Sequence, residues 1–369
     1  MHICGSHGLP LAVHHSGSIQ VSDMPNQPAR CPSPIDCVVS REPVVERIRG
    51  QGHRVHIPIG AVCNNNCLFC MEEDREARKR INGEMRGDRV RWVLESNRGA
   101  DEVCFTSGEP TMHPELALLV REAQELGYER ISLMTNGRRL AYPGFASQLV
   151  RAGLNRLYLS IHGHNAELHD SLTRTPGSFA QTLAGLHIAA TFRSRGVSLH
   201  TSTVLTTRNA TVQLEIYEML VQAGVDQAVF NALQVTGRAA RFVDRIVPRY
   251  EQVRSSFDRL VRNAADGGAR AFLVDVPLCV THGLPENSRG WVERHVHYES
   301  DGRNANPLGI GAEGGMRRID TSDLDNAFRS FATGCDRCAY RSVCPGVYTA
   351  YAAHHGWAEF QPVPIVEPA

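Results

Sequence analysis

A short loop of this chain carries three cysteines, Cys63, Cys67 and Cys70, at a C-x3-C-x2-C spacing directly after the apolar segment 55–62. Three thiolates from one loop can hold three irons of a cubane iron–sulfur cluster, so that the fourth iron stays open to another ligand. A zinc site is the alternative, but it needs a fourth Cys or His close by and usually takes its cysteines in C-x2-C pairs. The spacing therefore favours a cluster with one reactive iron.

A second cysteine group lies toward the C-terminus and consists of Cys279, Cys335, Cys338 and Cys344, the last three at a C-x2-C-x5-C spacing. Four thiolates are enough to saturate one further iron–sulfur cluster, and they equally satisfy the tetrahedral coordination of zinc. Taken alone, these residues leave both possibilities open.

Short β-like runs and helical patterns alternate from residue 55 onward, which is typical of βα units and a parallel sheet. We predict strands at 55–62, 102–107, 130–135, 156–161, 197–204 and 227–232, and helices at about 84–98, 114–126, 144–152, 178–194, 210–223 and 249–263. Six such units predict an α/β fold, a partial (β/α)6 TIM-like barrel followed by a small Cys-rich domain. In such barrels the chemistry collects at the C-terminal ends of the strands, where the first cysteine loop lies.

The composition restricts the class of protein. The 369 residues are enough for one large domain and a smaller one, and 39 Lys and Arg residues balance 39 Asp and Glu residues. We therefore expect no nucleic-acid partner, and without a run of ~20 apolar residues we expect no membrane partner. Because the N-terminus has no signal-peptide pattern, we expect a cytoplasmic protein, and for its eleven cysteines metal or cluster binding is favoured over disulfides.

The end of the second strand runs into a tight turn of Ser107, Gly108, Glu109 and Pro110. Its backbone carbonyls and the Glu109 carboxylate can receive an ammonium group, such as the α-amino end of an amino acid. The alternative is a plain turn ahead of a helix that begins at Pro114, a favourable residue in a first helical turn.

Polar residues also follow the third and fourth strands. Ser160 and His162 lie on the same face of their strand, because side chains alternate, and both can reach the barrel lumen. We interpret His162 and His169 as orienting or surface histidines rather than catalytic ones. The pair Asn136 and Gly137 is interpreted as a turn.

The cysteine loop and the Ser107–Pro110 turn together resemble the radical S-adenosylmethionine (radical SAM) superfamily, over about residues 53–346. In that family the amino and carboxyl groups of SAM chelate the open iron of a [4Fe–4S] cluster, and an electron from the cluster cleaves SAM to a 5′-deoxyadenosyl radical. The turn corresponds to the family's Gly-Gly-Glu-Pro motif, with Ser107 in place of the first glycine.

The resemblance also implies which residues bind SAM. It implies that Gly108 and Glu109 contact the amino group of SAM and that Ser160 contacts the ribose. It further implies that Arg174 binds the carboxylate and that Phe230 and Asn231 contact the adenine. A solvated loop arginine is the alternative interpretation of Arg174.

The C-terminal cysteines, joined to such a barrel, resemble the twitch or SPASM extension that houses auxiliary [4Fe–4S] clusters. Their number suffices for one auxiliary cluster, which favours the shorter, twitch-like form. We predict a loose extension at 1–50, the barrel at 51–265, the auxiliary domain at 266–350 and a tail at 351–369.

The function that the resemblance implies is a radical SAM enzyme that removes a substrate hydrogen and oxidises or cross-links its substrate, with a ribosomal peptide as the first hypothesis. It further implies a flavodoxin- or ferredoxin-type reductant. Because the segment 1–50 is short and polar, we expect a separate protein to recognise a peptide leader.

Two alternatives remain open. Within the family the substrate can be a small molecule, as in a molybdopterin-type nucleotide cyclase or an alcohol dehydrogenase-like enzyme, although the chain ends in Val-Glu-Pro-Ala and not in the Gly-Gly tail of the molybdopterin enzyme. Outside enzymes, a zinc-binding interaction protein is the competing hypothesis.

Overall fold

The computed structural model describes residues 53–72, 74–83, 85–264, 268–284, 303–304, 309–310, 316–317, 328–342, 344 and 346–365. All of them belong to one compact unit, Ser40–Ala369. The extension that we expect at 1–50 lies outside the described residues.

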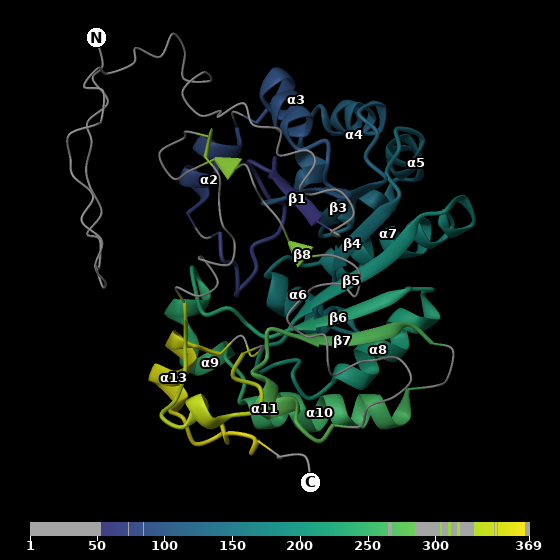
Figure 1. Ribbon diagram of the computed structural model, residues 1–369. Coiled ribbons are helices and arrows are strands. Elements are labelled where there is room, and N and C mark those ends of the chain that lie inside the picture. Colours follow the sequence, from purple (N-terminus) through teal and green to yellow (C-terminus); the bar gives the residue numbers. More distant parts are fainter. Residues whose placement is uncertain are drawn as a thin grey trace, which may run out of the picture. The chain divides into compact units, whose positions relative to one another are not determined.

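The central element is a sheet with the strand order β7-β6-β5-β4-β3-β2-β1-β8, in which all neighbouring strands are parallel (Figure 1). Its strands are β1 (His53–Pro58), β2 (Glu102–Thr106), β3 (Arg130–Thr135), β4 (Arg156–Ser160), β5 (Ser198–Val204), β6 (Gln227–Asn231), β7 (Arg270–Val274) and β8 (Arg303–Asn304). This arrangement confirms the predicted α/β partial barrel.

The sheet holds more strands than the six expected, because β8 pairs with β1 at one edge and β7 adds a strand at the other edge. The strand β7 pairs with β6 in a register that runs from Gln227 opposite Arg270 to Asn231 opposite Val274. Apart from exposed Arg270, every residue of β7 is buried, as expected for a parallel strand that is covered on both faces.

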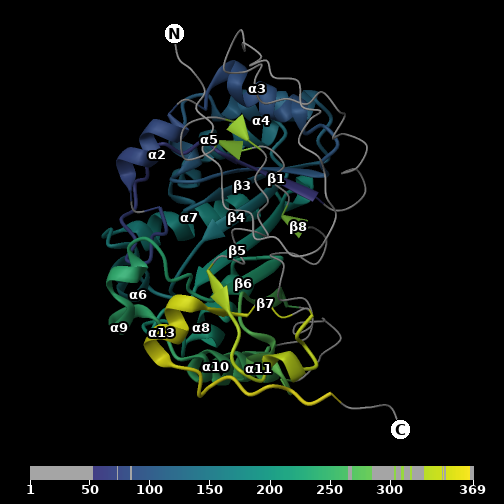
Figure 2. The same cartoon turned by 60° about the vertical axis from the view of Figure 1, so that its left-hand side comes forward.

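Helices connect the strands and pack against the sheet (Figures 1 and 2). They are α2 (Arg75–Asn82), α3 (Gly87–Ser96), α4 (Leu116–Glu125), α5 (Pro143–Arg151), α6 (Ala166–Thr173), α7 (Ser178–Ala190), α8 (Gln213–Gln222), α9 (Val243–Ile246), α10 (Tyr250–Asn263), α11 (Leu278–Thr281) and α13 (Thr349–His355). Short 3-10 turns are η1 (Pro110–Met112), η2 (Arg138–Ala141), η3 (Arg193–Arg195), η4 (Ala239–Arg241) and η5 (Cys335–Arg337). Apolar side chains of strands and helices form one large buried core, in which Phe105, Phe230 and Phe257 are among the largest fully buried side chains.

The C-terminal segment packs against α10 (Figures 1 and 2). It includes the antiparallel pair β11 (Arg329–Ser330) and β12 (Val347–Tyr348), and a second small pair joins β9 (Gly309–Ile310) to β10 (Met316–Arg317). The rings of Tyr250 on α10 and Tyr351 on α13 have centroids 4.4 Å apart, and Phe360 is buried beside both. The described part of the expected tail, 351–365, therefore contributes a helix and buried side chains.

Within the described residues, no helix combines the length and apolar character needed to cross a membrane.

Candidate active site

A cavity of ≈ 270 Å³ lies at the C-terminal ends of the barrel strands. Cys63, Cys67 and Cys70 line it from the loop after β1. The other strand ends contribute Thr106, Gly108, Met134, Thr135, Asn136, Ser160, His162, Ser202, Val204, Asn231 and Asp275, among other residues. The three thiols thus face a polar space built by the whole sheet, at the edge where parallel barrels carry their chemistry.

The three thiols are partly withdrawn from water and close enough to influence one another. Burial raises the pKa of Cys67 to about 12, and the neighbouring Cys63 and Cys70 raise it further. Burial also raises the pKa of Cys63 and of Cys70. A bound metal cluster supplies the positive charge that such thiolates need, so this donor set fits a cluster ligated by three cysteines.

Glu109 is not among the residues that line the cavity, and its expected contact with an ammonium group stays a prediction. Its carboxylate is 1% exposed and accepts hydrogen bonds from the backbone nitrogens of Thr111 and Asn136, at 3.0 and 2.8 Å. The hydroxyls of Thr111 and Thr135 also donate to it. Glu109 therefore ties the turn after β2 to the end of β3, while its neighbour Gly108 lines the cavity.

Ser160 and His162 line the cavity, as their shared strand face predicts. The ring of His162 packs edge-on against Phe69 of the cysteine loop, with centroids 4.7 Å apart, and its Nδ1 accepts from the backbone nitrogen of Val204 at 3.3 Å. Burial holds the pKa of His162 well below its usual range, and burial lowers that of His169 to about 4. Both histidines are buried and neutral, so they orient neighbouring groups and are not surface residues.

Arg174 and Phe230 lie away from the cavity. Arg174 is exposed and ends α6 with a φ of 52°, and its contact with the SAM carboxylate stays a prediction. Phe230 is fully buried in the core, with its ring centroid 6.4 Å from that of Phe257, because it points to the opposite face from its neighbour. That neighbour, Asn231, lines the cavity and donates to Ser202 Oγ at 2.8 Å.

Several cavity residues received no role in the site from the sequence analysis, among them Asn136, Glu72 and Asp275. Asn136 follows β3, where Asn-Gly is more often a simple turn, and Glu72, two residues after Cys70, accepts from the backbone nitrogen of Gly108 at 2.7 Å. Asp275 follows β7 with a φ of 64° and pairs with Arg329 at 2.9 Å. Position directly after a barrel strand was the available signal for Asn136 and for Asp275.

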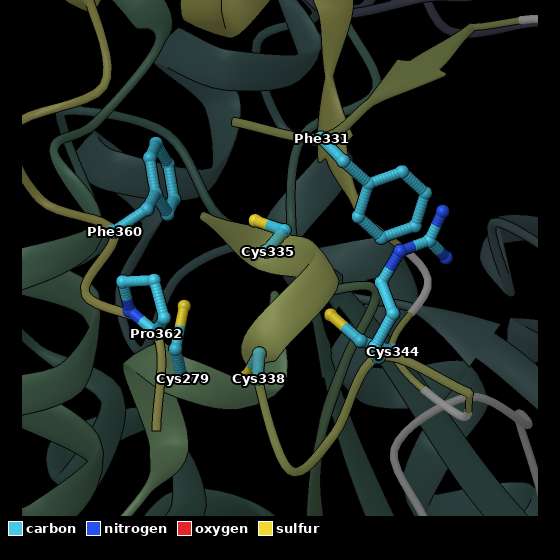
Figure 3. A pocket seen from close by; sticks show the side chains of 8 residues that line it. Cys279, Phe331, Cys335, Cys338, Cys344, Phe360 and Pro362 are labelled. Carbon is cyan, nitrogen blue, oxygen red and sulfur yellow. The ribbon is translucent and has the colours of Figure 1, made fainter. Parts of the chain in front are cut away.

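The C-terminal cysteines Cys279, Cys335, Cys338 and Cys344 converge on one small cavity of ≈ 20 Å³ (Figure 3). Burial raises the pKa of Cys279 to about 12, and the other three thiols add to this effect. The cavity is also lined by Phe331, Arg341, Phe360 and Pro362.

Backbone N–H groups point at two of these sulfurs. The nitrogen of Gly346 donates to Cys344 Sγ at 3.4 Å, and the nitrogen of Val363 donates to Cys338 Sγ at 3.3 Å. Such hydrogen bonds stabilise thiolate ligands, so four converging cysteines fit a second, fully ligated cluster. Among the described side chains, no three His, Cys, Asp or Glu residues are placed to hold a single metal ion. The support for cluster binding is therefore the number and type of the cysteines in the two groups, and not a preformed coordination geometry.

A partial parallel barrel with a three-cysteine loop at the end of its first strand defines a class of iron–sulfur barrel protein. Residues 57–220 match the model of the Radical SAM superfamily. This segment, somewhat less than half of the chain, is therefore similar to that superfamily.

Two curated relatives each match about half of the chain. An AdoMet-dependent heme synthase of Oleidesulfovibrio alaskensis is 29% identical over 199 residues, which cover 53% of this chain and 50% of the relative. A probable GTP 3′,8-cyclase of Metallosphaera sedula is 31% identical over 185 residues, which cover 50% of this chain and 56% of the relative. The chain thus spans about half the length of these relatives.

Solved structures share the fold over a longer part of the chain. Streptococcus suis SuiB bound to S-adenosylmethionine superposes with a TM-score of 0.53 and 16% identity, over 86% of this chain and 77% of SuiB. The protein anSMEcpe with bound AdoMet and the Kp18Cys peptide gives a TM-score of 0.53 and 15% identity, over 84% of this chain and 93% of that protein.

Proposed function

We propose that this protein is a radical SAM enzyme whose Cys63, Cys67 and Cys70 bind a [4Fe–4S] cluster, with SAM in the adjoining cavity. The observation that carries the proposal is that these three thiols line the same ≈ 270 Å³ cavity as the polar ends of the barrel strands. When bound, the cluster and SAM supply a 5′-deoxyadenosyl radical that removes a hydrogen atom from the substrate.

The residues of the chain position the cofactor and exclude water. Ser160 and Asn231 present polar side chains to the cavity, and Gly108 lines it from the turn after β2. Gly108 has a φ of 50°, and an added Cβ would lie 2.3 Å from Gly60 O, so the turn accepts no larger residue there. His162 gives the cavity a neutral imidazole wall, because its Nδ1 is bound to the backbone.

Cys279, Cys335, Cys338 and Cys344 would hold an auxiliary [4Fe–4S] cluster that supplies electron transfer. Four thiols leave no iron open to the substrate, which favours accepting an electron over binding the substrate. This assignment supports oxidation or cross-linking as the overall reaction, because both remove electrons from the substrate.

The proposed substrate is a peptide. The fold similarity to anSMEcpe, a structure that holds AdoMet together with a peptide, extends over 84% of this chain. A small molecule is the second candidate, since the relatives by sequence are named as a heme synthase and a GTP cyclase.

The substrate test measures 5′-deoxyadenosine after anaerobic reconstitution and reduction with dithionite, with SAM alone and with each candidate substrate. A short peptide encoded beside the gene should increase deoxyadenosine formation and lose mass by pairs of hydrogen atoms. An increase with GTP or with a porphyrin, and none with the peptide, would transfer the assignment to the small-molecule class. Failure to form deoxyadenosine under any condition would refute the enzyme itself.

A further inference from the structure

The three asparagines between Cys63 and Cys67 take no part in the proposed chemistry, yet the side chain of each is held. Asn64 Oδ1 accepts from Asn136 Nδ2 at 2.6 Å, and Asn65 Oδ1 accepts from an arginine, Arg138, at 3.0 Å. Asn66 Oδ1 accepts from a second arginine, Arg238, at 2.7 Å. The spacer of the cysteine motif is therefore fastened to other parts of the barrel.

Arg238 makes the most extensive of these contacts, from the turn that follows β6. Its Nη1 lies 2.8 Å from the backbone oxygens of both Asn66 and Cys67, and its own backbone nitrogen donates to Cys70 O at 3.0 Å. One residue thus binds the loop on both sides of its second cysteine, from a position more than 160 residues away in the sequence.

The residue before it brings the two segments into close contact. Gly237 has a φ of 54°, and a Cβ built on it would lie 2.3 Å from Met71 O and 2.7 Å from Cys70 O. No side chain fits at such distances, so the backbone of this turn lies directly against the end of the cysteine loop. This backbone contact holds Arg238 next to the carbonyl groups of the cysteine loop.

The guanidinium also brings a permanent positive charge to the thiols. The guanidinium lies next to the cluster ligands, since its Nη1 donates to the backbone oxygen of Cys67 at 2.8 Å. A cluster bound to three thiolates is anionic when reduced, and reduction adds one electron. A nearby cation therefore stabilises the reduced form more than the oxidised form.

We propose that Arg238 is a positioning residue that holds the cysteine loop, residues 61–72, in its cluster-binding shape before any metal enters, and that its charge raises the reduction potential of the cluster. The positioning role is tested on the metal-free chain. The effect on the potential rests on the proposed function.

The test compares Arg238→Gln, which removes the charge, with Arg238→Lys, which keeps the charge but cannot reach the same oxygens with a planar guanidinium. Arg245→Gln is the matched control, since Arg245 is an exposed arginine a few residues further along. Circular dichroism verifies that each variant is folded. Should Arg238→Gln fail to fold, the hydrogen-exchange measurement described below is made on Arg238→Lys and on Asn66→Ala, which removes the asparagine side chain that Arg238 contacts.

Two readouts separate geometry from charge. In metal-free protein, amide hydrogen exchange of residues 61–72 should become at least tenfold faster in both Arg238 variants and stay unchanged in Arg245→Gln. In reconstituted protein, a redox titration followed by electron paramagnetic resonance should show a lower potential for Arg238→Gln, by about 59 mV, which is tenfold in the one-electron equilibrium. Arg238→Lys should keep the wild-type potential.

Unchanged exchange in the metal-free Arg238 variants would overturn the positioning role. An unchanged potential in Arg238→Gln would overturn the role of the charge. A wild-type protein that binds no cluster would refute the proposed function and the effect on the potential together, whereas the exchange measurement would still decide the positioning role.

Discussion

Replacing Glu109 by glutamine tests whether this carboxylate is structural or binds SAM. The side chain is 1% exposed and receives four hydrogen bonds from three residues, Thr111, Thr135 and Asn136. Glutamine has nearly the same shape, but one of its two terminal atoms is an NH2 group. That group would face the backbone N–H of Asn136, which has Glu109 Oε2 as its acceptor at 2.8 Å.

The expected loss of stability follows from these contacts. A buried backbone donor without a partner costs about 1–3 kcal/mol, and the bonds that remain lose the added strength of a charged acceptor. Together these effects predict that Glu109→Gln lowers the free energy of unfolding by about 2–5 kcal/mol, a large part of the roughly 5–15 kcal/mol typical of a folded protein.

Urea unfolding of the metal-free protein, followed by circular dichroism, measures this loss. Glu125→Gln is the control, since Glu125 is an exposed glutamate on α4 and its replacement should change stability by less than about 0.5 kcal/mol. If Glu109→Gln unfolds like the wild type but no longer binds SAM, the structural role is wrong and the ammonium contact implied by the sequence motif is right.

Three further predictions concern single residues. Gly237→Ala should lower the free energy of unfolding by about 1–3 kcal/mol through its positive φ alone. It should also lower the iron content after reconstitution, because the added Cβ would meet Met71 O, and wild-type iron content would contradict this contact. Burial lowers the pKa of His169 to about 4 from 6.5. As the pH falls, the imidazole of His169 therefore takes up a proton in the unfolded chain before it does so in the folded protein. The contribution of neutral His169 to stability is therefore complete above pH 6.5 and is lost as pH falls toward 4. His169→Gln should make the urea midpoint depend less on pH between 6.5 and 4. An unaltered slope in this range would show that His169 does not titrate as inferred. Cys279→Ser should remove iron from the auxiliary site and spare deoxyadenosine formation, and a variant with full iron content would exclude Cys279 as a ligand.

The barrel could be predicted from the sequence because its strands are buried on both faces and therefore appear as short, continuous apolar runs between helical patterns. The strand β7 has the same character, but the Asp-Gly-Gly sequence at 266–268 suggests a domain boundary before it. Only pairing with β6 shows that this strand completes the sheet. Sheet order is a property of contacts between distant segments, which local patterns do not contain.

The candidate site could be predicted to the level of its cysteines. Spacing identified the thiols of both groups, and strand alternation placed Ser160 in the lumen. The orientation of the Glu109 side chain could not be predicted. The motif specifies only that a glutamate stands at this position, whereas its carboxylate turns toward hydrogen-bond donors at the end of β3, which are distant in the sequence. The contacts of Arg238 with the cysteine loop were hidden for the same reason.

The most direct test of the central claim is the iron and sulfide content after anaerobic reconstitution, measured with deoxyadenosine formation in the wild type and in a Cys63/Cys67/Cys70→Ala variant. Two cubane clusters predict about eight irons in the wild type and about four in the variant, with deoxyadenosine formation lost. A colourless wild type without iron, or a variant that still cleaves SAM, would contradict the assignment of the catalytic cluster to this loop.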